Sequence, residues 1–184
     1  NVLVILNFFI SFSVTVPLPY IINNLLNLSS NQYGIIQGAF PVGMILGAVV
    51  VGKIIEKIDY MKLLIFSSIT LSVAIALLGL PLILADASSL AYMIYYISIM
   101  VIFGIAISFI DVPILWLMQK SIPDNLRGKV LSISMSIVKL IAPLGLVISG
   151  MIINSVPVYI MTFAGGGILM LSNLMILNQK NKPA

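Results

Sequence analysis

The sequence contains no cysteine and no histidine, and only 8% of its 184 residues are charged. Without cysteine the chain has no disulfide framework and no thiol chemistry. Without histidine it lacks the commonest metal ligand and the commonest general base, so metalloenzymes and serine–histidine hydrolases lose most of their support. A soluble domain carries roughly a quarter charged residues, and the low charge therefore argues against a fold that is stable in water.

Apolar residues dominate what is present: 61% of the chain is hydrophobic, and the mean hydropathy is +1.21. A membrane-spanning helix needs about 20 mostly apolar residues. Irregular backbone is costly in hydrocarbon, and the apolar runs lack the period-two alternation of barrel strands. We therefore predict an all-α polytopic membrane protein, a single six-helix bundle over residues 1–184. The predicted helices are 2–22, 33–54, 62–83, 91–118, 129–153 and 157–177.

Basic residues gather in every second connecting segment, which explains the net charge of +4 without a nucleic-acid partner. Loops rich in Lys and Arg stay cytoplasmic. We expect both chain ends to be cytoplasmic and the protein to lie in the plasma (inner) membrane, with lipid as its solvent. The bases in question are Lys53, Lys57 and Lys62, then Lys120, Arg127 and Lys129, and finally Lys180 and Lys182.

Three predicted helices carry a polar face. Asp111 and Lys139 are the only charged residues well inside a predicted span, and charge at that depth usually means an ion pair or a water-filled cavity. Either a permanent ion pair braces two helices, or Asp111 exchanges a proton while Lys139 holds its charge or attracts an anionic substrate. The helix at 62–83 has no comparable face, and we expect it to face lipid. The candidate cavity residues are Asn7, Ser11 and Thr15, then Ser108 and Asp111, and finally Ser132, Ser136 and Lys139.

Glycine and proline positions predict packing and bends. Small residues spaced by four let helix backbones approach closely in lipid, and the helix at 33–54 carries two such pairs. Proline removes a backbone donor, so the first helix should bend or end near Pro17 and Pro19, and the fourth should kink near Pro113. The glycines expected to face another helix are Gly34, Gly38, Gly43 and Gly47.

Two basic loops resemble a known family. The segment 52–62 resembles the G-x-x-x-D-R-x-G-R-R loop motif of major facilitator superfamily transporters, although Asp59 stands where the family has its second glycine. The segment 123–129 looks like the P-x-x-x-R-G-x stretch before the fifth helix of a half, and 143–150 is similar to that helix in the macrolide-efflux-like drug transporters. The matching residues are Gly52, Glu56, Lys57, Lys62, Arg127 and Gly128.

The resemblance implies a secondary active transporter. This chain would be the C-terminal half of a twelve-helix protein, in line with a first residue, Asn1, that is not methionine. The implied activity is proton-coupled efflux of a small amphipathic molecule by alternating access, with no cofactor, no metal and no nucleic acid. The implied partners are the N-terminal six-helix half, or a second copy of the chain, and a small-molecule substrate. Glu56 or Lys57 could latch one access state by capping a helix or pairing with a charge, or the loop could simply be a solvated turn.

Other functions remain to be weighed. A non-transport membrane scaffold or assembly subunit is the main alternative. An intramembrane enzyme is disfavoured, because histidine and cysteine are missing and no Gly-x-Ser-x-Gly signature appears. Ser136 and Lys139 are spaced as Ser-x-x-Lys, but no credible oxyanion site accompanies them. A channel is possible in principle, but the sequence has no charged ring or filter sequence.

The charge pattern makes the topology testable. In intact cells, a Ser88→Cys variant should react with an impermeant thiol reagent, and a Ser121→Cys variant should not, because Ser121 borders a basic segment. The chain has no cysteine of its own to add background. Labelling of Ser121→Cys together with protection of Ser88→Cys would reverse the predicted orientation.

Overall fold

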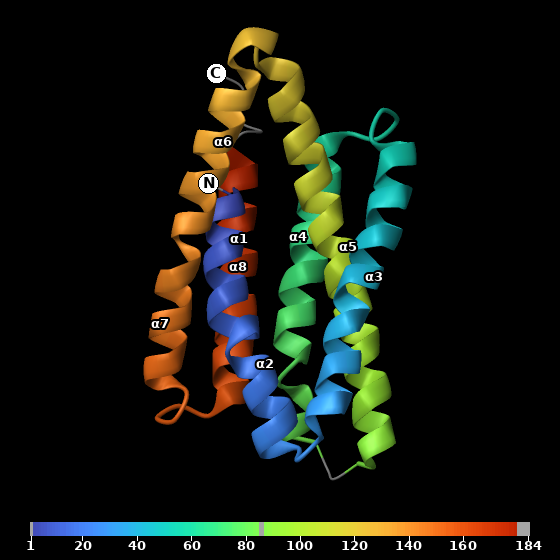
Figure 1. Ribbon diagram of the computed structural model, residues 1–184, viewed down its shortest axis with the longest axis vertical. Coiled ribbons are helices and arrows are strands. Elements are labelled where there is room, and N and C mark those ends of the chain that lie inside the picture. The colour runs from blue at the N-terminus through green and yellow to red at the C-terminus, as the bar shows by residue number, and fades with distance from the viewer. Residues whose placement is uncertain (1, 85–86, 180–184) are drawn as a thin grey trace.

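The computed structural model describes residues 2–84 and 87–179 (Figure 1), and these residues form helices joined by short turns with no strand among them. This confirms the predicted all-α class. The helical elements, in chain order, are α1 (Val2–Ile10), η1 (Ser11–Thr15), α2 (Pro17–Pro19), η2 (Tyr20–Leu25), α3 (Ser30–Ile54), α4 (Tyr60–Leu77), η3 (Leu80–Leu82), α5 (Ser89–Ser121), α6 (Asp124–Leu140), α7 (Ala142–Ile152) and α8 (Val158–Gln179).

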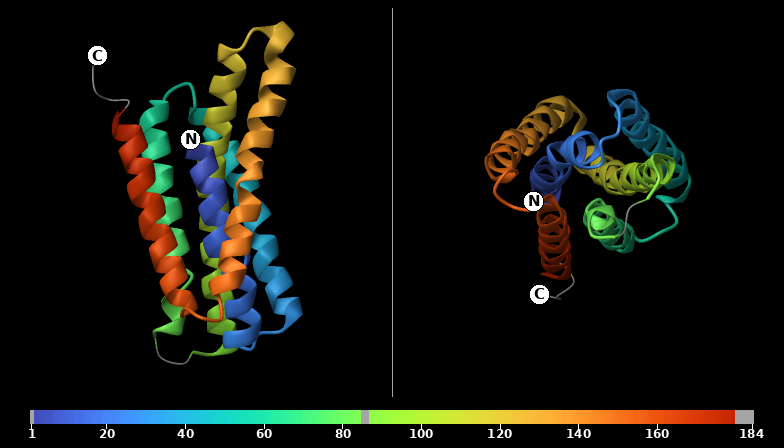
Figure 2. Two further views of the ribbon diagram at one scale, coloured as in Figure 1. Left: turned by 90° about the vertical axis from the view of Figure 1, so that its left-hand side faces the viewer. Right: turned by 90° about the horizontal axis from the view of Figure 1, so that it is seen from below.

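The helical stretches agree with the predicted spans to within a few residues at each end. Five are long and apolar enough to cross a membrane, and the sixth, α8, is apolar over Val158–Asn173. The helices run along one long axis in an elongated bundle (Figures 1 and 2). The spans that qualify are Val2–Leu25, Ser30–Ile54, Tyr60–Leu82, Ser89–Ser121 and Asp124–Ile152.

Packing brings distant parts of the chain together. α5 lies against both α3 and α4, and α4 lies against α8. The first span, α1 to η2, contacts α7 and α8 although they follow it by more than a hundred residues. The end-on view shows α6 and α7 on the outside of the bundle (Figure 2), and α6 has no buried residue.

The most extensive contact between two described helices is between α3 and α5. A Cβ on Gly43 would collide with the backbone of Val101, and a Cβ on Gly104 would collide with the carbonyl of Phe40. A Cβ on Gly47 would also come too close to the backbone of Ile105, at 2.9 Å. Three glycines on two helices therefore let the two backbones touch, as the small-residue spacing predicts for this half of α3.

The other glycine pair of α3 behaves differently. A Cβ on Gly34 or Gly38 would meet nothing within 4 Å, because this face of the helix points away from the described bundle. Among the described residues no helix meets this pair, so the prediction that all four glycines face a helix stays a prediction for Gly34 and Gly38. The spacing alone cannot tell which side of a helix meets its neighbour.

The prediction that the third span faces lipid is wrong. α4 is flanked by α5 and α8, and its three serines are buried. Ser67 donates to the carbonyl of Leu63 at 2.7 Å, and Ser72 donates to the carbonyl of Ser68 at 2.8 Å. Because these hydroxyls bond within their own helix, they need no outside partner. The serines therefore pack against the neighbouring helices like small apolar residues.

Prolines alter the helical path in two spans. The first span does not end at Pro17 or Pro19 but continues to Leu25, because the turns around the prolines widen into π-helix. The fifth span is interrupted at Ile141, where Pro143 cannot supply the N–H that would close the turn. α5, in contrast, stays helical through Pro113.

The α3–α5 contact predicts a mutational effect. Gly43→Leu should lower the free energy of unfolding in detergent by about 1–3 kcal/mol, because the side chain must displace the backbone of α5. Gly38→Leu is the matched control on the same helix, and it should leave stability nearly unchanged because its Cβ meets open space. Equal melting temperatures for the parent and the Gly43→Leu variant would contradict the close backbone contact.

Candidate functional site

The basic segments lie at one end of the bundle. The α3–α4 turn and the α5–α6 turn are both at the upper end in Figure 1, and the α7–α8 turn is at the lower end. Lys53, in the last turn of α3, belongs to the upper end. Lys180 and Lys182 lie outside the described residues, as does Asp86. The charge separation predicted along the sequence is thus a separation between two ends of one bundle.

The motif-like turn between α3 and α4 contains an unexpected helix cap. Asp59 precedes α4, and its Oδ1 accepts a hydrogen bond from the backbone N–H of Met61 at 2.9 Å. Gly52, Glu56, Lys57 and Lys62 are exposed. Among the described residues Glu56 neither caps a helix nor forms a salt bridge, which corresponds to the solvated-turn alternative. Asp59 caps α4 because it lies next to the free N–H groups at the helix start. Asp59 stands where the family motif has its second glycine, and this departing residue is the one that caps α4.

The second motif-like segment forms the first turn of α6. Arg127 pairs with Asp124, one turn earlier in the same helix, in the only salt bridge among the described residues. Gly128 is exposed, and a Cβ there would meet nothing within 4 Å. An exposed pair of this kind contributes little to stability. It does not join α6 to another element.

The two charges inside the predicted spans line the same cavity. This cavity has a volume of about 270 Å³ and lies between the first span, α3, α5 and α6. Asp111 reaches it from α5, Lys139 from α6 and Asn7 from α1. The remaining lining is apolar and consists of Leu6, Ile10, Phe40, Met44, Ile107 and Ile110.

Lys139 is held by an amide and not by a carboxylate. Its Nζ donates to Oδ1 of Asn7 at 3.1 Å. The amide is itself oriented, because Asn7 Nδ2 donates to the carbonyl of Leu3 at 2.8 Å. The bond within α1 occupies the donor end of the side chain, and the acceptor end is thereby turned toward Lys139.

Asp111 makes no salt bridge within 4.0 Å among the described residues, although it shares the cavity with Lys139. Its position is set by the α3–α5 contact. Ser108, one turn earlier on α5, donates to the carbonyl of Met44 at 2.8 Å and ties the two helices together at the cavity. The carboxylate is half-buried in a mostly apolar wall and remains able to accept a proton or a cationic group.

Two predicted cavity residues of the first span lie elsewhere. Ser11 is buried and packs against Gly145 of α7. Thr15 is exposed and donates to the carbonyl of Ile10. Both belong to the π-helical turn, whose wider path alters the face on which each following side chain lies. The expected stripe at four-residue spacing therefore reduces to Asn7.

Three more predicted cavity residues do not line this cavity. Ser108 faces the α3 backbone, as described above. Ser132 and Ser136 are exposed, and Ser136 donates to the carbonyl of Ser132 within α6. The sequence did not indicate Phe40 and Met44 as cavity residues. They are apolar, so only the side of α3 that faces α5 places them there.

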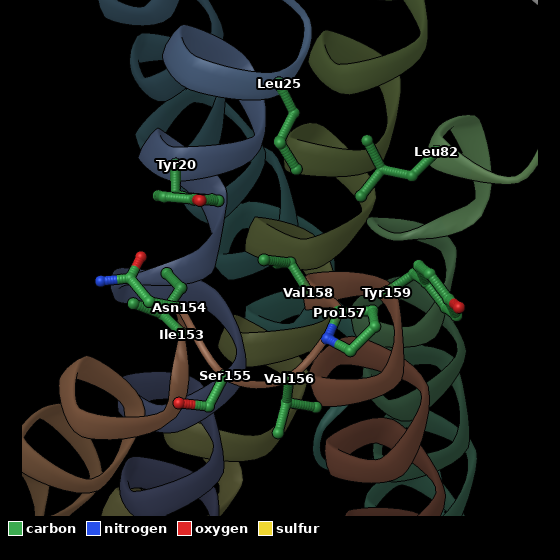
Figure 3. A pocket seen from close by; sticks show the side chains of 10 residues that line it. All are labelled: Tyr20, Leu25, Leu82, Ile153, Asn154, Ser155, Val156, Pro157, Val158 and Tyr159. Atoms are coloured by element: carbon green, nitrogen blue, oxygen red, sulfur yellow. The ribbon is translucent and has the colours of Figure 1, made fainter.

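A larger cavity lies at the other end of the described bundle. It has a volume of about 540 Å³ and is built by η2, η3 and the α7–α8 turn, with Tyr20 and Tyr159 on different sides (Figure 3). Its lining carries no carboxylate and no basic group. It therefore lacks the charge chemistry of the smaller cavity around Asp111, which we take as the candidate functional site.

The fold and the paired basic loops can now be compared with known proteins. The family sequence model of the Major Facilitator Superfamily matches residues 2–183 of the chain. The chain belongs to the major facilitator superfamily. No curated protein and no solved structure gives a significant match. The superfamily match spans nearly the whole chain and therefore covers both basic loops and all the helices.

Membership of the major facilitator superfamily gives the bundle a function. Its members are membrane transporters, so the protein is a multi-pass membrane transporter and the scaffold alternative loses its support. In such proteins substrate binds between helical bundles near the middle of the membrane. The cavity around Asp111 lies part-way along the spans and not at either end of them.

The Asp59 cap can be tested against Glu56, which the motif comparison favoured. Asp59→Ala should lower the free energy of unfolding by about 1 kcal/mol, because it leaves an N–H of α4 without its acceptor. Glu56→Ala removes a carboxylate from the same turn and should change stability by less than about 0.5 kcal/mol. Denaturant titration of both variants in detergent measures the difference, and a larger loss for Glu56→Ala would reverse the assignment.

Proposed function

We propose that this chain is the C-terminal six-helix half of a proton-coupled exporter of small amphipathic molecules. The observation that carries the proposal is the arrangement of Asp111 and Lys139 in one cavity, with the lysine already bound by Asn7. The carboxylate is then the group that is free to change its protonation state. Proton coupling, export and the missing half are parts of this proposal and go beyond family membership.

The proposed coupling step uses only groups in the cavity. A carboxylate within a span is costly when charged, so it tends to be neutralised by a proton or by a nearby cation. In one access state Asp111 takes up a proton from water on the acidic side. In the other state a cationic group, either Lys139 released from Asn7 or a basic substrate, favours the charged carboxylate and drives the proton out.

The lining of the cavity favours an amphipathic substrate. Most of its wall is aliphatic or aromatic, with Phe40 and Met44 on the α3 side, while the polar groups gather at one place. Ligand sites in proteins commonly combine an apolar wall with a few polar groups that fix orientation. A volume of about 270 Å³ in this half is at the low end for such sites, and the N-terminal half would supply the opposite wall.

The proposed orientation follows from the basic end of the bundle. The α3–α4 and α5–α6 turns face the cytoplasm, because basic loops are retained on that side. Both chain ends are then cytoplasmic, and the protein lies in the plasma (inner) membrane. The large uncharged cavity at the α7–α8 turn opens on the outer side.

The coupling role of Asp111 can be measured in the full-length transporter in proteoliposomes. Asp111→Asn should abolish transport driven by a proton gradient and leave substrate exchange partly intact, because the amide keeps the size of the side chain but carries no exchangeable charge. Asn7→Leu is a second variant at the cavity. It should weaken transport by releasing Lys139, without removing the response to the gradient.

The double variant Asp111→Asn with Lys139→Met tests the alternative of a structural brace. If it restores stability lost in the single variants and still transports under a proton gradient, the two residues form an ion pair that holds the helices. The coupling carboxylate would then lie in the other half. If the Asp111→Asn variant alone shows unchanged gradient-driven transport, Asp111 does not couple transport to protons.

A further inference from the structure

The seam between α4 and α8 contains polar side chains that have no visible role in transport. Asn173 of α8 is 0% exposed, and Ser68 of α4 is 1% exposed. Neither the hydroxyl of Ser68 nor the two polar atoms of the Asn173 amide has a hydrogen-bond partner among the described residues. Burying such groups without partners is costly, and lipid offers none.

The helix register places the two residues in one stretch of the seam. Gly166 of α8 lies against Ser72 and Ala76 of α4, and Gly79 lies against Tyr159. The two helices are therefore antiparallel neighbours, as Figure 2 shows along their length. Seven residues make close to two helical turns, so the Gly166 face of α8 returns at Asn173.

Because the helices are antiparallel, the corresponding step on α4 runs seven residues back from Ser72 and Ala76. It reaches residues 65–69, a stretch that contains Ser68. Asn173 lies about 9 Å from the Gln179 end of α8, and Ser68 lies about 12 Å from the Tyr60 end of α4. Both are thus at a similar depth below the basic end of the bundle. The surrounding seam is apolar, with Leu71 and Leu169 fully buried.

We propose that the α4–α8 seam binds at least one ordered water molecule between Ser68 and Asn173. The two side chains share a seam and a depth but make no direct hydrogen bond. Buried waters typically make about three hydrogen bonds to polar groups that would otherwise be unsatisfied. A water here accepts from the Asn173 amide and donates to the Ser68 hydroxyl, and the Asn173 carbonyl offers a further acceptor.

The other polar side chains of α4 explain why this position is different. Ser67 is equally buried and adjacent in sequence, but its hydroxyl bonds to the carbonyl of Leu63. Ser72 likewise bonds to the carbonyl of Ser68. Only Ser68 among these three leaves its hydroxyl available to a bound water.

A double-mutant cycle on the full-length transporter in detergent tests the proposal. Ser68→Ala and Asn173→Leu should each lower the melting temperature by about 2 °C or more, because each removes one partner of the water and leaves the other less satisfied. The double variant should lose less than the sum of the two, since the remaining seam is apolar and needs no water. If each single change raises the melting temperature and the gains add, the groups are unpaired in the native state and no water is bound.

Ser67→Ala is the matched control, because it removes a hydroxyl of equal burial one residue away that is already bonded. Its loss of melting temperature should add to that of Asn173→Leu in a double variant, whereas the loss caused by Ser68→Ala should not add in this way. A map of the full-length protein at a resolution that shows waters gives the direct result. Density between Ser68 and Asn173 supports the site, and a direct hydrogen bond from Asn173 to another protein group overturns it.

Discussion

The backbone contact between α3 and α5 is the constraint on which the candidate site depends. Gly43 and Gly104 have no side chain that would hold the helices apart, and the Ser108 hydroxyl then reaches the carbonyl of Met44. Asp111 follows Ser108 by one turn, so the same contact sets the depth and direction of the carboxylate. It also brings the apolar α3 side chains to the cavity wall. In lipid, where apolar surface gives no preference for one neighbour, such close packing is what selects partners.

The way in which the cavity accommodates its two charged residues also depends on the lipid environment. Lys139 is held by the oriented amide of Asn7 and not by Asp111, although all three line one cavity. A buried salt bridge would satisfy both charges but leave neither free to respond to a proton or a substrate. An amide binds the ammonium group without a counter-charge, and the carboxylate keeps its own exchange chemistry. This division of roles is the basis for proposing that the site changes charge at Asp111.

Several local features are readable from the sequence once the solvent is known to be lipid. Apolar length locates the spans, because a helix must cover the hydrocarbon, and the observed helices begin and end close to the predicted ones. The break at Ile141 and the π turns near Pro17 were harder to foresee. A proline removes a donor in every helix, but whether the chain widens, breaks or continues depends on the neighbours that can accommodate it. The burial of α4 escaped prediction for a related reason, since serines that bond within their helix pack like small apolar residues.

The sequence by itself determined the helical class, the approximate spans, the basic end of the bundle and the two charges at membrane depth, because each depends on composition along a short stretch. Only the tertiary structure decided which faces meet. It placed Asn7 beside Lys139 across 132 positions of the chain, assigned Gly43 to a contact and Gly34 to open space, and buried Asn173 in the α4–α8 seam. Helix periodicity defines the faces of one helix, but the rotation of one helix against another is set by packing over its whole length, and no single segment contains that information.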